Sequence, residues 1–309
     1  MWSGARVATL VVSIGALVYV AATCTSPTRD VADRYESITV HHTMGTTTID
    51  RLPKKVVTLG DQWTANTLAL GVTPIGAFAP LPGTAPPWLP KLEPPSLIDP
   101  AGNVIAQIAA RQPDLILLDG MFADRKNYDD LAGIAPTVAG LTGGWQEQLP
   151  TLGRILGKQQ TADKLVNQFD KALADIVAAV PKLHGATYCT SWLTSDTQLL
   201  VLAGPNDDFG GTLPRLGLHL PEPLATKGRM SLPPNQIHEL SADVLLLGYS
   251  PGLADTYPTL PGYTELPAAR KGSVVLLTTE ELAALQQPTA LSAPYLLEKL
   301  KPALTLAMR

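Results

Sequence analysis

Aromatic, arginine and amide side chains gather on the loops that follow the strand-like segments of this sequence. Gln62 and Trp63 come directly after the apolar run 54–59, at the start of a helical pattern. An amide and a flat ring at this place could contact a ligand while the N-terminal amides of the helix favour its negative groups, although Trp63 suits core packing equally well. Similar residues occupy other loops: Trp88, Phe122, Arg125, Trp192, Arg229, Tyr249 and Tyr257. Together they predict a ligand-binding site.

Common catalytic motifs do not occur in the sequence. It has no G-x-S-x-G, no H-E-x-x-H, no Walker A loop and no G-x-G-x-x-G after a strand, which argues against the commonest hydrolases, metalloproteases and nucleotide-binding enzymes. Asp207 and Asp208 are neighbours in a turn rather than two carboxylates that face each other across a bond. The chain is therefore not expected to be an enzyme.

Histidine and cysteine are too few and too scattered to predict a metal site. His41 and His42 are adjacent on a predicted hairpin, so their side chains point to opposite faces and do not share one ion. Besides Cys24, the only cysteine is Cys189, and its apolar neighbours predict a small buried residue. We expect neither a metal site nor a resident cofactor.

Composition limits the classes of partner. The chain has 309 residues and a formal net charge of −4. Because it lacks an excess of basic residues, nucleic acid is not an expected partner, and neither is charge-driven adhesion to anionic lipid. The length suits about two compact domains.

The N-terminal residues resemble an export signal. Arg6 precedes an uncharged apolar run (7–22) that is short for a membrane span and suits the core of a signal peptide. The run ends in AATC, which resembles the box at which a bacterial lipoprotein is lipidated on its cysteine, here Cys24. A plain signal peptide and an uncleaved anchor helix are the alternatives, and all three place residues 25–309 outside the cytoplasmic membrane.

Strand and helix signals alternate along most of the remaining chain, the pattern of parallel sheets with helical crossovers. From Trp145 to Pro181 one long or kinked amphipathic helix interrupts this alternation, with apolar residues at helical spacing. The predicted parts are a signal (1–24), a tether (25–37), an N-terminal α/β lobe (38–157), a connecting helix (158–181) and a C-terminal α/β lobe (182–309).

Two segments share one pattern of polar and apolar residues, RQPDLILLDG (111–120) and LSADVLLLGY (240–249). In each, the end of a predicted helix leads into a central strand. With GDQWTANTLALGVTPIGA, NVIAQIAARQ, YDDLAGIAPTV and ELPAARKGSVVLL, their order and spacing are similar to those of class III periplasmic substrate-binding proteins, which serve ABC importers of ferric siderophores, haem and cobalamin. The resemblance covers nearly all of 38–305. It implies an α/β fold of two Rossmann-like lobes joined by a single long α-helix, with the ligand cleft between the lobes.

This resemblance implies a monomeric, extracytoplasmic solute-binding protein that captures a ferric siderophore and delivers it for import. Aromatic walls and arginines that donate to chelating oxygens suit a bulky, often anionic ferric chelate. Haem-binding members usually supply tyrosine or histidine from the upper loops of the first lobe, and residues 79–100 contain neither. Haem, cobalamin and a cell-envelope scaffold without an importer are the alternatives.

Family members generally dock the permease through a glutamate on each lobe, in the helices that precede the repeated strands. Here the first such helix has no acidic residue and the second has only Glu239 near its end. We therefore expect docking to use Glu93, Glu222 or Glu239, and we regard an ABC permease as a less secure partner than the ferric siderophore.

Overall fold

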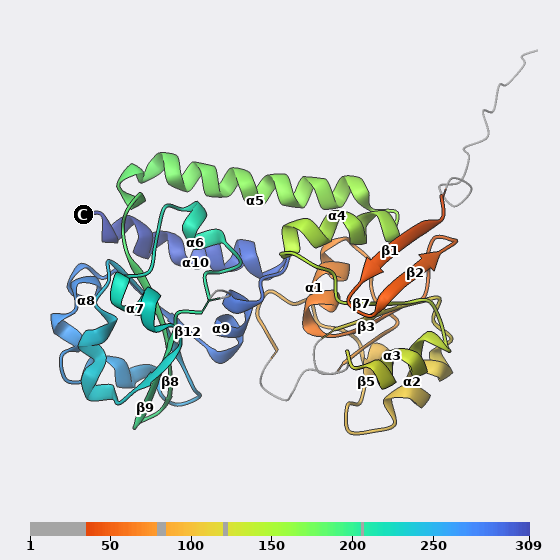
Figure 1. Ribbon diagram of the computed structural model, residues 1–309, viewed down its shortest axis with the longest axis horizontal. Helices are drawn as coiled ribbons and strands as arrows, with labels where there is room; N and C mark the ends of the chain where they lie inside the picture. The colour runs from red at the N-terminus through yellow and green to blue at the C-terminus, as the bar shows by residue number, and fades with distance from the viewer. Residues whose placement is uncertain (1–34, 79–84, 120–122, 205–206) are drawn as a thin grey trace, which may run out of the picture. The chain divides into compact units, whose positions relative to one another are not determined.

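The computed structural model describes residues 35–309 except 79–84, 120–122 and 205–206. The predicted signal, Cys24 and most of the tether lie outside the described residues, and so does Phe122. In the described part, no helix is both long and apolar enough to cross a membrane. This part contains two five-stranded sheets and a two-stranded hairpin (Figure 1).

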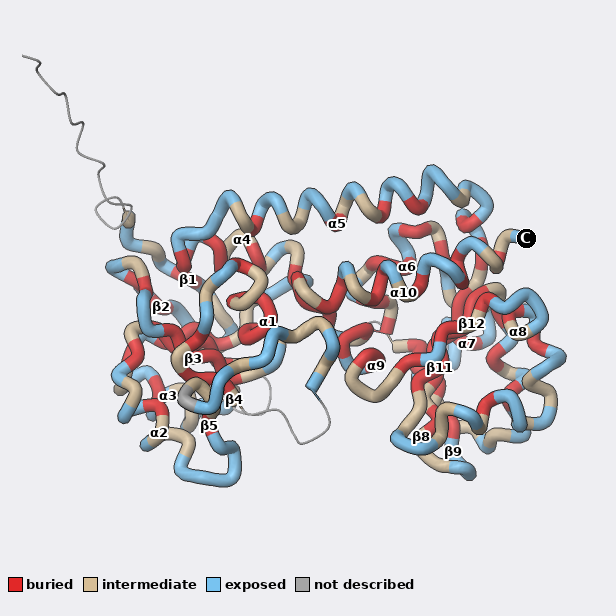
Figure 2. Tube along the Cα trace, turned by 180° about the vertical axis from the view of Figure 1, so that it is seen from behind, coloured by how far each residue is buried: buried red, intermediate tan, exposed pale blue. Residues whose placement is uncertain are grey.

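The first sheet is entirely parallel, as the alternation of strands and helices predicts. Its order is β5-β4-β3-β6-β7, and its central strands are buried on both faces (Figure 2). Helix α2 contacts the edge strand β5, α3 contacts the opposite edge strand β7, and α1 contacts the central strand β3. The elements are β3 (Val56–Leu59), α1 (Asp61–Ala69), β4 (Gly76–Phe78), β5 (Leu97–Ile98), α2 (Val104–Arg111), β6 (Leu115–Leu118), α3 (Arg125–Ala132) and β7 (Thr137–Ala139).

The predicted hairpin is present as β1 (Ile38–His42) and β2 (Gly45–Ile49). It is attached to β7, because the Thr43 backbone N–H donates to Ala139 O at 2.9 Å and the Thr47 hydroxyl donates to Thr137 O at 2.6 Å. The hairpin is therefore tied to the first sheet by hydrogen bonds, of which the one from Thr47 is buried.

The second sheet is mixed rather than entirely parallel. Its order is β10-β9-β8-β11-β12, and β9 runs antiparallel to both neighbours because only a two-residue turn separates it from β8. The elements are β8 (Tyr188–Ser195), β9 (Gln198–Leu202), α6 (Thr212–Arg215), α7 (Glu222–Lys227), β10 (Met230–Leu232), β11 (Val244–Tyr249), α8 (Pro267–Lys271), β12 (Val274–Leu277), α9 (Thr279–Gln286) and α10 (Ser292–Ala307).

The long helical segment is two helices rather than one. α4 (Trp145–Ile155) ends before Gly157, whose φ of 65° is left-handed, and α5 (Gln159–Ala179) follows. A side chain at Gly157 would also meet Leu52 Cδ1 at 2.8 Å. The break therefore falls where backbone and packing both favour glycine, and α5, the longer of the two helices, leads toward the second sheet (Figure 1).

A buried hydrogen bond joins elements that belong to the two halves of the chain. Asn66 on α1 is 2% exposed, and its Oδ1 accepts the Ala290 backbone N–H at 2.8 Å. Replacing Asn66 by alanine would leave that N–H without an acceptor, so we expect the free energy of unfolding to fall by about 1–3 kcal/mol. Chemical denaturation measures the change, with exposed Asn235→Ala as the control. Equal stability of the two variants would contradict this role of Asn66.

Candidate ligand-binding face

One face of the second sheet is covered over only part of its width. Helices α9 and α10 pack on β11 and β12, where Gly248 leaves room for Leu282: a Cβ at this glycine would lie 2.5 Å from Leu282 Cδ2. The register places Trp192 beside Gly248, Leu200 beside Trp192, and Ser231 beside Leu200, so these residues form one row on the same face. Trp192 and Leu200 are half-buried and Ser231 is exposed.

We call this exposed part of β8, β9 and β10 the open face. It comprises Trp192, Thr194, Gln198, Leu200, Ser231 and, directly before β10, Arg229. Hydrogen bonds link its polar side chains: the Thr194 hydroxyl donates to Gln198 Oε1 at 2.9 Å, and Gln198 Nε2 donates to Ser231 Oγ at 3.3 Å. The open face thus combines an indole ring, an aliphatic side chain and several hydrogen-bonding groups.

Arg229 is held in place by a buried carboxylate. The side chain of Asp207 is 2% exposed, whereas that of Arg229 is 56% exposed. Arg229 Nε donates to Asp207 Oδ2 at 2.7 Å and Arg229 Nη2 donates to Asp207 Oδ1, while Asp207 Oδ2 also accepts the Gly204 backbone N–H at 2.7 Å. This two-pronged ion pair fixes the plane of an exposed guanidinium, whose Nη1 has no partner among the described residues.

Two buried polar atoms on this face also have no partner among the described residues. They are Trp192 Nε1 and Thr190 Oγ1, two positions apart on β8 and therefore on the same side of the sheet. A buried donor without an acceptor is costly, so the indole N–H is a candidate to donate to a bound water or ligand oxygen. The sequence contains no local signal for this property.

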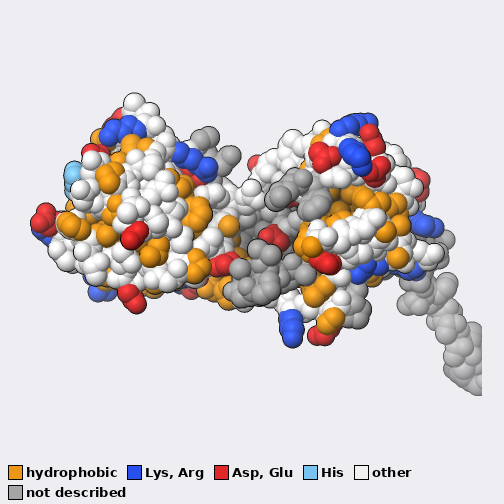
Figure 3. Space-filling view, turned by 90° about the horizontal axis from the view of Figure 1, so that it is seen from below, with side chains coloured by type: hydrophobic (Ala, Val, Ile, Leu, Met, Phe, Trp, Pro, Cys, Tyr) orange, Lys and Arg blue, Asp and Glu red, His pale blue; other side chains and the backbone are white. Residues whose placement is uncertain are grey.

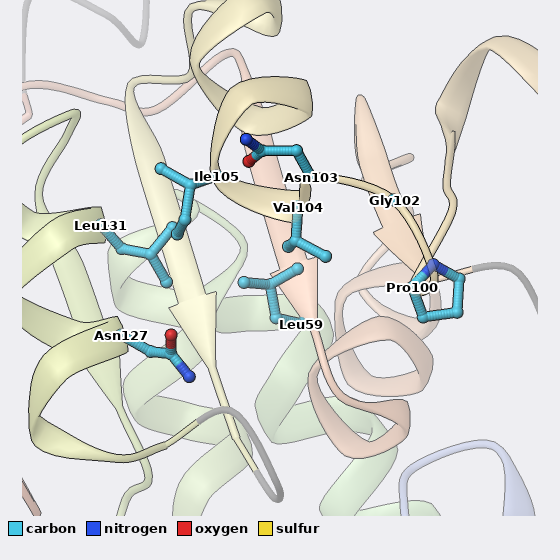
Figure 4. A pocket seen from close by; sticks show the side chains of 8 residues that line it. All are labelled: Leu59, Pro100, Gly102, Asn103, Val104, Ile105, Asn127 and Leu131. Atoms are coloured by element: carbon cyan, nitrogen blue, oxygen red, sulfur yellow. The ribbon is translucent and has the colours of Figure 1, made fainter.

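The first sheet has a small pocket of its own (Figure 4). It encloses about 280 Å³ at the carboxyl end of β3, between the starts of α2 and α3. Its walls are mostly apolar: Leu59, Pro100, Gly102, Asn103, Val104, Ile105, Asn127 and Leu131. Asn103 and Asn127 are already engaged, because the Asn103 side chain accepts the Ala106 N–H and Asn127 Nδ2 donates to Asp124. A bulky ligand would not fit in this volume.

A second hollow, of about 340 Å³, lies in the second sheet at the N-terminal ends of strands β8 and β11. Its lining includes Lys182, His184, Asp243 and Lys271. Lys271 Nζ already donates to Ala307 O at 2.7 Å. None of the predicted ligand residues lines this hollow.

The predicted site residues near the first sheet have different environments. Trp63 is 3% exposed and its Nε1 donates to Leu118 O at 3.0 Å, so it packs in the core, which was one of its two predicted roles. Gln62 is half-buried at the start of α1. Arg125 is exposed, pairs with Asp129 at 3.1 Å and lies 5.6 Å from the centre of the Tyr128 ring.

Trp88, Tyr249 and Tyr257 lie in three different environments. Trp88 packs against Tyr295 of α10, with 5.2 Å between ring centres. Tyr249 is half-buried at the end of β11. The prediction that Tyr257 contacts the ligand is wrong for this conformation, because its side chain is fully buried and its hydroxyl donates to Gly248 O at 2.8 Å. Burial raises the pKa of its phenol, as expected for a core residue.

The structure brings together Trp192 and Arg229 on the open face but does not bring Arg125 to it. Sequence reasoning missed Thr194, Gln198 and Ser231, because their place on the same face as Trp192 depends on the pairing of β8, β9 and β10. The lone thiol of Cys189 is fully buried, and burial raises its pKa to about 12, in keeping with a core residue.

The predicted docking glutamates lie on three separate elements. Glu93 is exposed at the turn before 94–96, and Glu222 is exposed at the start of α7. Glu239 is half-buried and pairs with Lys227 at 3.3 Å. Docking through these residues stays a prediction.

His42 beside Tyr128 predicts a dependence of stability on pH. Its Nδ1 accepts the Met44 N–H at 3.2 Å and its Nε2 is 2.9 Å from the Thr47 hydroxyl, a pattern that needs a neutral ring. Burial and the neighbouring His41 lower the pKa of His42 below 6.5. The unfolded chain therefore binds this proton more readily, and stability should fall modestly as the pH drops below about 6.5.

Unfolding curves between neutral and mildly acidic pH measure this effect. His42→Gln should flatten the part of the pH dependence near that value, whereas His184→Gln, at an exposed position, should leave it unchanged. An identical pH profile for wild type and His42→Gln would remove His42 as the cause.

Comparison with known proteins identifies the family to which the chain belongs. A sequence model of the family described as periplasmic binding protein matches residues 56–281. The chain belongs to this periplasmic binding protein family. The match includes both sheets from β3 to β12 and thus the whole open face. The coarse class of the chain is therefore a binding protein.

Individual relatives agree with this family. The "Probable siderophore-binding lipoprotein YfiY" of Bacillus subtilis is 34% identical over 147 residues, 45% of this chain and 44% of that protein. The "Ferric enterobactin-binding periplasmic protein FepB" of Escherichia coli is 31% identical over 147 residues, 42% of this chain and 45% of that protein. The chain therefore matches about half the length of these curated relatives.

A solved structure supports the fold. The periplasmic solute binding protein of Mycobacterium smegmatis superposes with a TM-score of 0.73, at 24% identity, over 88% of this chain and 99% of that one. This likeness confirms the predicted α/β fold class, with its two sheets and connecting helix.

Proposed function

We propose that this chain is an extracytoplasmic solute-binding protein that captures a ferric siderophore and delivers it for import, without converting it chemically. The observation that carries the proposal is the open face, where an indole ring lies on the same side of one sheet as an arginine fixed by Asp207. A ferric chelate has an apolar periphery and outward-facing oxygens, which suit these two groups.

The relatives favour this ligand class over others. The Bacillus relative is named for siderophore binding and the Escherichia relative for ferric enterobactin. Gln62, Trp88, Arg125 and Tyr249 are proposed as further contacts, made when the two halves of the chain enclose the ligand. The ligand brings its own iron, so no resident cofactor is part of the proposal.

Location and partners belong to the same proposal. The N-terminal run with Cys24 and the lipoprotein relative favour a lipid anchor on the outer side of the cytoplasmic membrane. An ABC permease is the proposed partner of a monomer, and exposed Glu93 and Glu222 are the most accessible of the three candidate docking residues.

Titration of the purified protein tests the function. Ferric siderophores of several classes, their iron-free forms, haemin and cobalamin are added in parallel, with tryptophan fluorescence and calorimetry as readouts and free tryptophan as the control for nonspecific quenching. Saturable binding of a ferric chelate without turnover is expected. Preference for haemin or cobalamin would replace the ligand, and turnover or binding of none of them would overturn the proposal.

A further inference from the structure

Acidic residues predominate where the parallel strands of both sheets end. Among the three residues that follow each such strand, the charged ones are all acids: Asp61, Asp99, Asp119, Asp196 and Glu280. The same positions contain no lysine, arginine or histidine. Of these acids, Asp196 lies in the turn between β8 and β9, directly beside the open face, so a strongly negative ligand would meet an unfavourable field there.

The two arginines proposed as ligand contacts do not reverse this field. The charge of Arg229 is matched by buried Asp207, and that of Arg125 is matched by Asp129. A neutral pair attracts a distant anion weakly, because attraction to the cation and repulsion from the carboxylate nearly cancel. The free N–H groups of the guanidinium still donate hydrogen bonds to an uncharged oxygen acceptor.

The surface of the described residues shown in Figure 3 has no large area of positive charge. Uncharged side chains and backbone make up most of the area in Figure 3, and both red and blue side chains are scattered among them. Residues 79–84 and 120–122, which follow β4 and β6 in the chain, also carry no charged side chain. No concentration of positive charge accompanies the candidate site in the described residues.

We infer that the site selects an uncharged or positively charged ferric chelate, such as a ferric tris-hydroxamate, over a triply negative ferric tris-catecholate. This inference rests on the proposed function and narrows its ligand class. The carbonyl oxygens of a neutral chelate accept from Arg229, and the indole of Trp192 offers a face that tolerates a cation. Asp207 is the positioning residue that sets both the orientation and the net charge of the arginine.

The test compares chelates of different charge on the intact protein. Calorimetry measures affinity for a neutral ferric tris-hydroxamate, a singly positive linear ferric tris-hydroxamate and a ferric tris-catecholate. The two hydroxamates should bind at least about tenfold more tightly than the catecholate. Added salt should strengthen binding of the catecholate and leave that of the neutral chelate nearly unchanged, because salt screens the repulsion.

A variant isolates the role of Asp207. Asp207→Asn keeps an acceptor for Gly204 and Arg229 and removes the negative charge, so the ratio of the affinity for the tris-catecholate to the affinity for the neutral chelate should rise about tenfold. Asp175→Asn on α5 makes the same change of net charge at an exposed distant position and should alter neither affinity. A thermal unfolding curve verifies that both variants are folded.

The outcomes separate the two proposals. If the tris-catecholate binds as tightly as the hydroxamates, or if Asp207→Asn and Asp175→Asn behave alike, the charge inference is wrong and a siderophore-binding function stands. If no ferric chelate binds saturably, the proposed function itself is wrong.

Discussion

Replacing Lys299 by alanine should lower the free energy of unfolding by about 3–5 kcal/mol, because it leaves a buried carboxylate without its cation. The side chain of Glu281 is 3% exposed, and Lys299 Nζ donates to its Oε1 at 2.6 Å. The Tyr295 hydroxyl donates to the same oxygen at 2.7 Å and the Thr278 N–H donates to Oε2 at 2.9 Å. Chemical denaturation at neutral pH measures the loss.

Two further variants distinguish burial of charge from loss of packing. Lys301→Ala removes an exposed lysine of the same helix and should cost little, since its pair with Glu298 is a surface contact of 3.6 Å. The double variant Glu281→Gln with Lys299→Met removes both charges, keeps an acceptor for the Thr278 N–H and offers an N–H that the Tyr295 hydroxyl accepts, so it should recover most of the lost stability. A double variant as unstable as Lys299→Ala would show that packing dominates.

The pH dependence of this cluster has a defined sign. Burial alone would raise the pKa of Glu281, but the hydrogen bonds from Lys299, Thr278 and Tyr295 outweigh it and lower that pKa below 4.5. Ionised Glu281 therefore stabilises the folded wild type at pH values above about 4.5, and this contribution is lost as the pH falls through the lowered pKa. In Lys299→Ala burial is no longer offset, so its deficit should shrink at acidic pH, where the carboxylate is protonated.

Replacing Trp192 by leucine should weaken binding of the preferred ferric chelate about 30-fold, the effect of removing a large aromatic contact from the centre of a binding surface. The indole lies in the middle row of the open face, between Leu200 and Gly248. Calorimetric titration with the chelate found to bind wild type measures the change. Trp192→Phe keeps an aromatic ring and removes the N–H, so its comparison with Trp192→Leu separates the contribution of the ring from that of the indole N–H.

The matched control lies in the same sheet. Leu276 on β12 is 37% exposed and pairs with Leu247, whose side chain belongs to the core of the other face. Leu276→Ala should therefore leave affinity unchanged, and unfolding midpoints confirm that each variant is folded. Wild-type affinity in Trp192→Leu would place the ligand elsewhere.

The sequence predicts helices and strands best where every residue of the element is buried and its apolar run therefore fits only one kind of element. The four residues of β6 are all buried, and LILL is recognisable as a central strand without tertiary information. β10 has only three residues, so it produces no periodic pattern long enough to predict. The antiparallel course of β9 depends on the short turn after β8, which the alternation of strands and helices does not reveal.

The site was less predictable because side-chain environment depends on register. Trp63 follows one predicted strand and Trp192 lies at the end of another, yet Trp63 donates its N–H to Leu118 inside the core and Trp192 lies on the open face. Tyr257 follows a proline-rich loop pattern typical of exposed residues but is fully buried. The bond between Asp207 and Arg229 spans 22 positions, which local spacing cannot predict.

Hydrogen–deuterium exchange on the intact protein, with and without a saturating neutral ferric tris-hydroxamate, tests the central claim most directly. If the open face binds the chelate, exchange should slow in peptides that cover 194–202 and 229–232, because β10 is an edge strand whose outward amides are otherwise free to exchange. The exchange rate of peptides around Lys182 and Lys271, which line the hollow at the N-terminal ends of β8 and β11, should not change. Saturable binding with protection at that hollow and none at the open face would contradict the account.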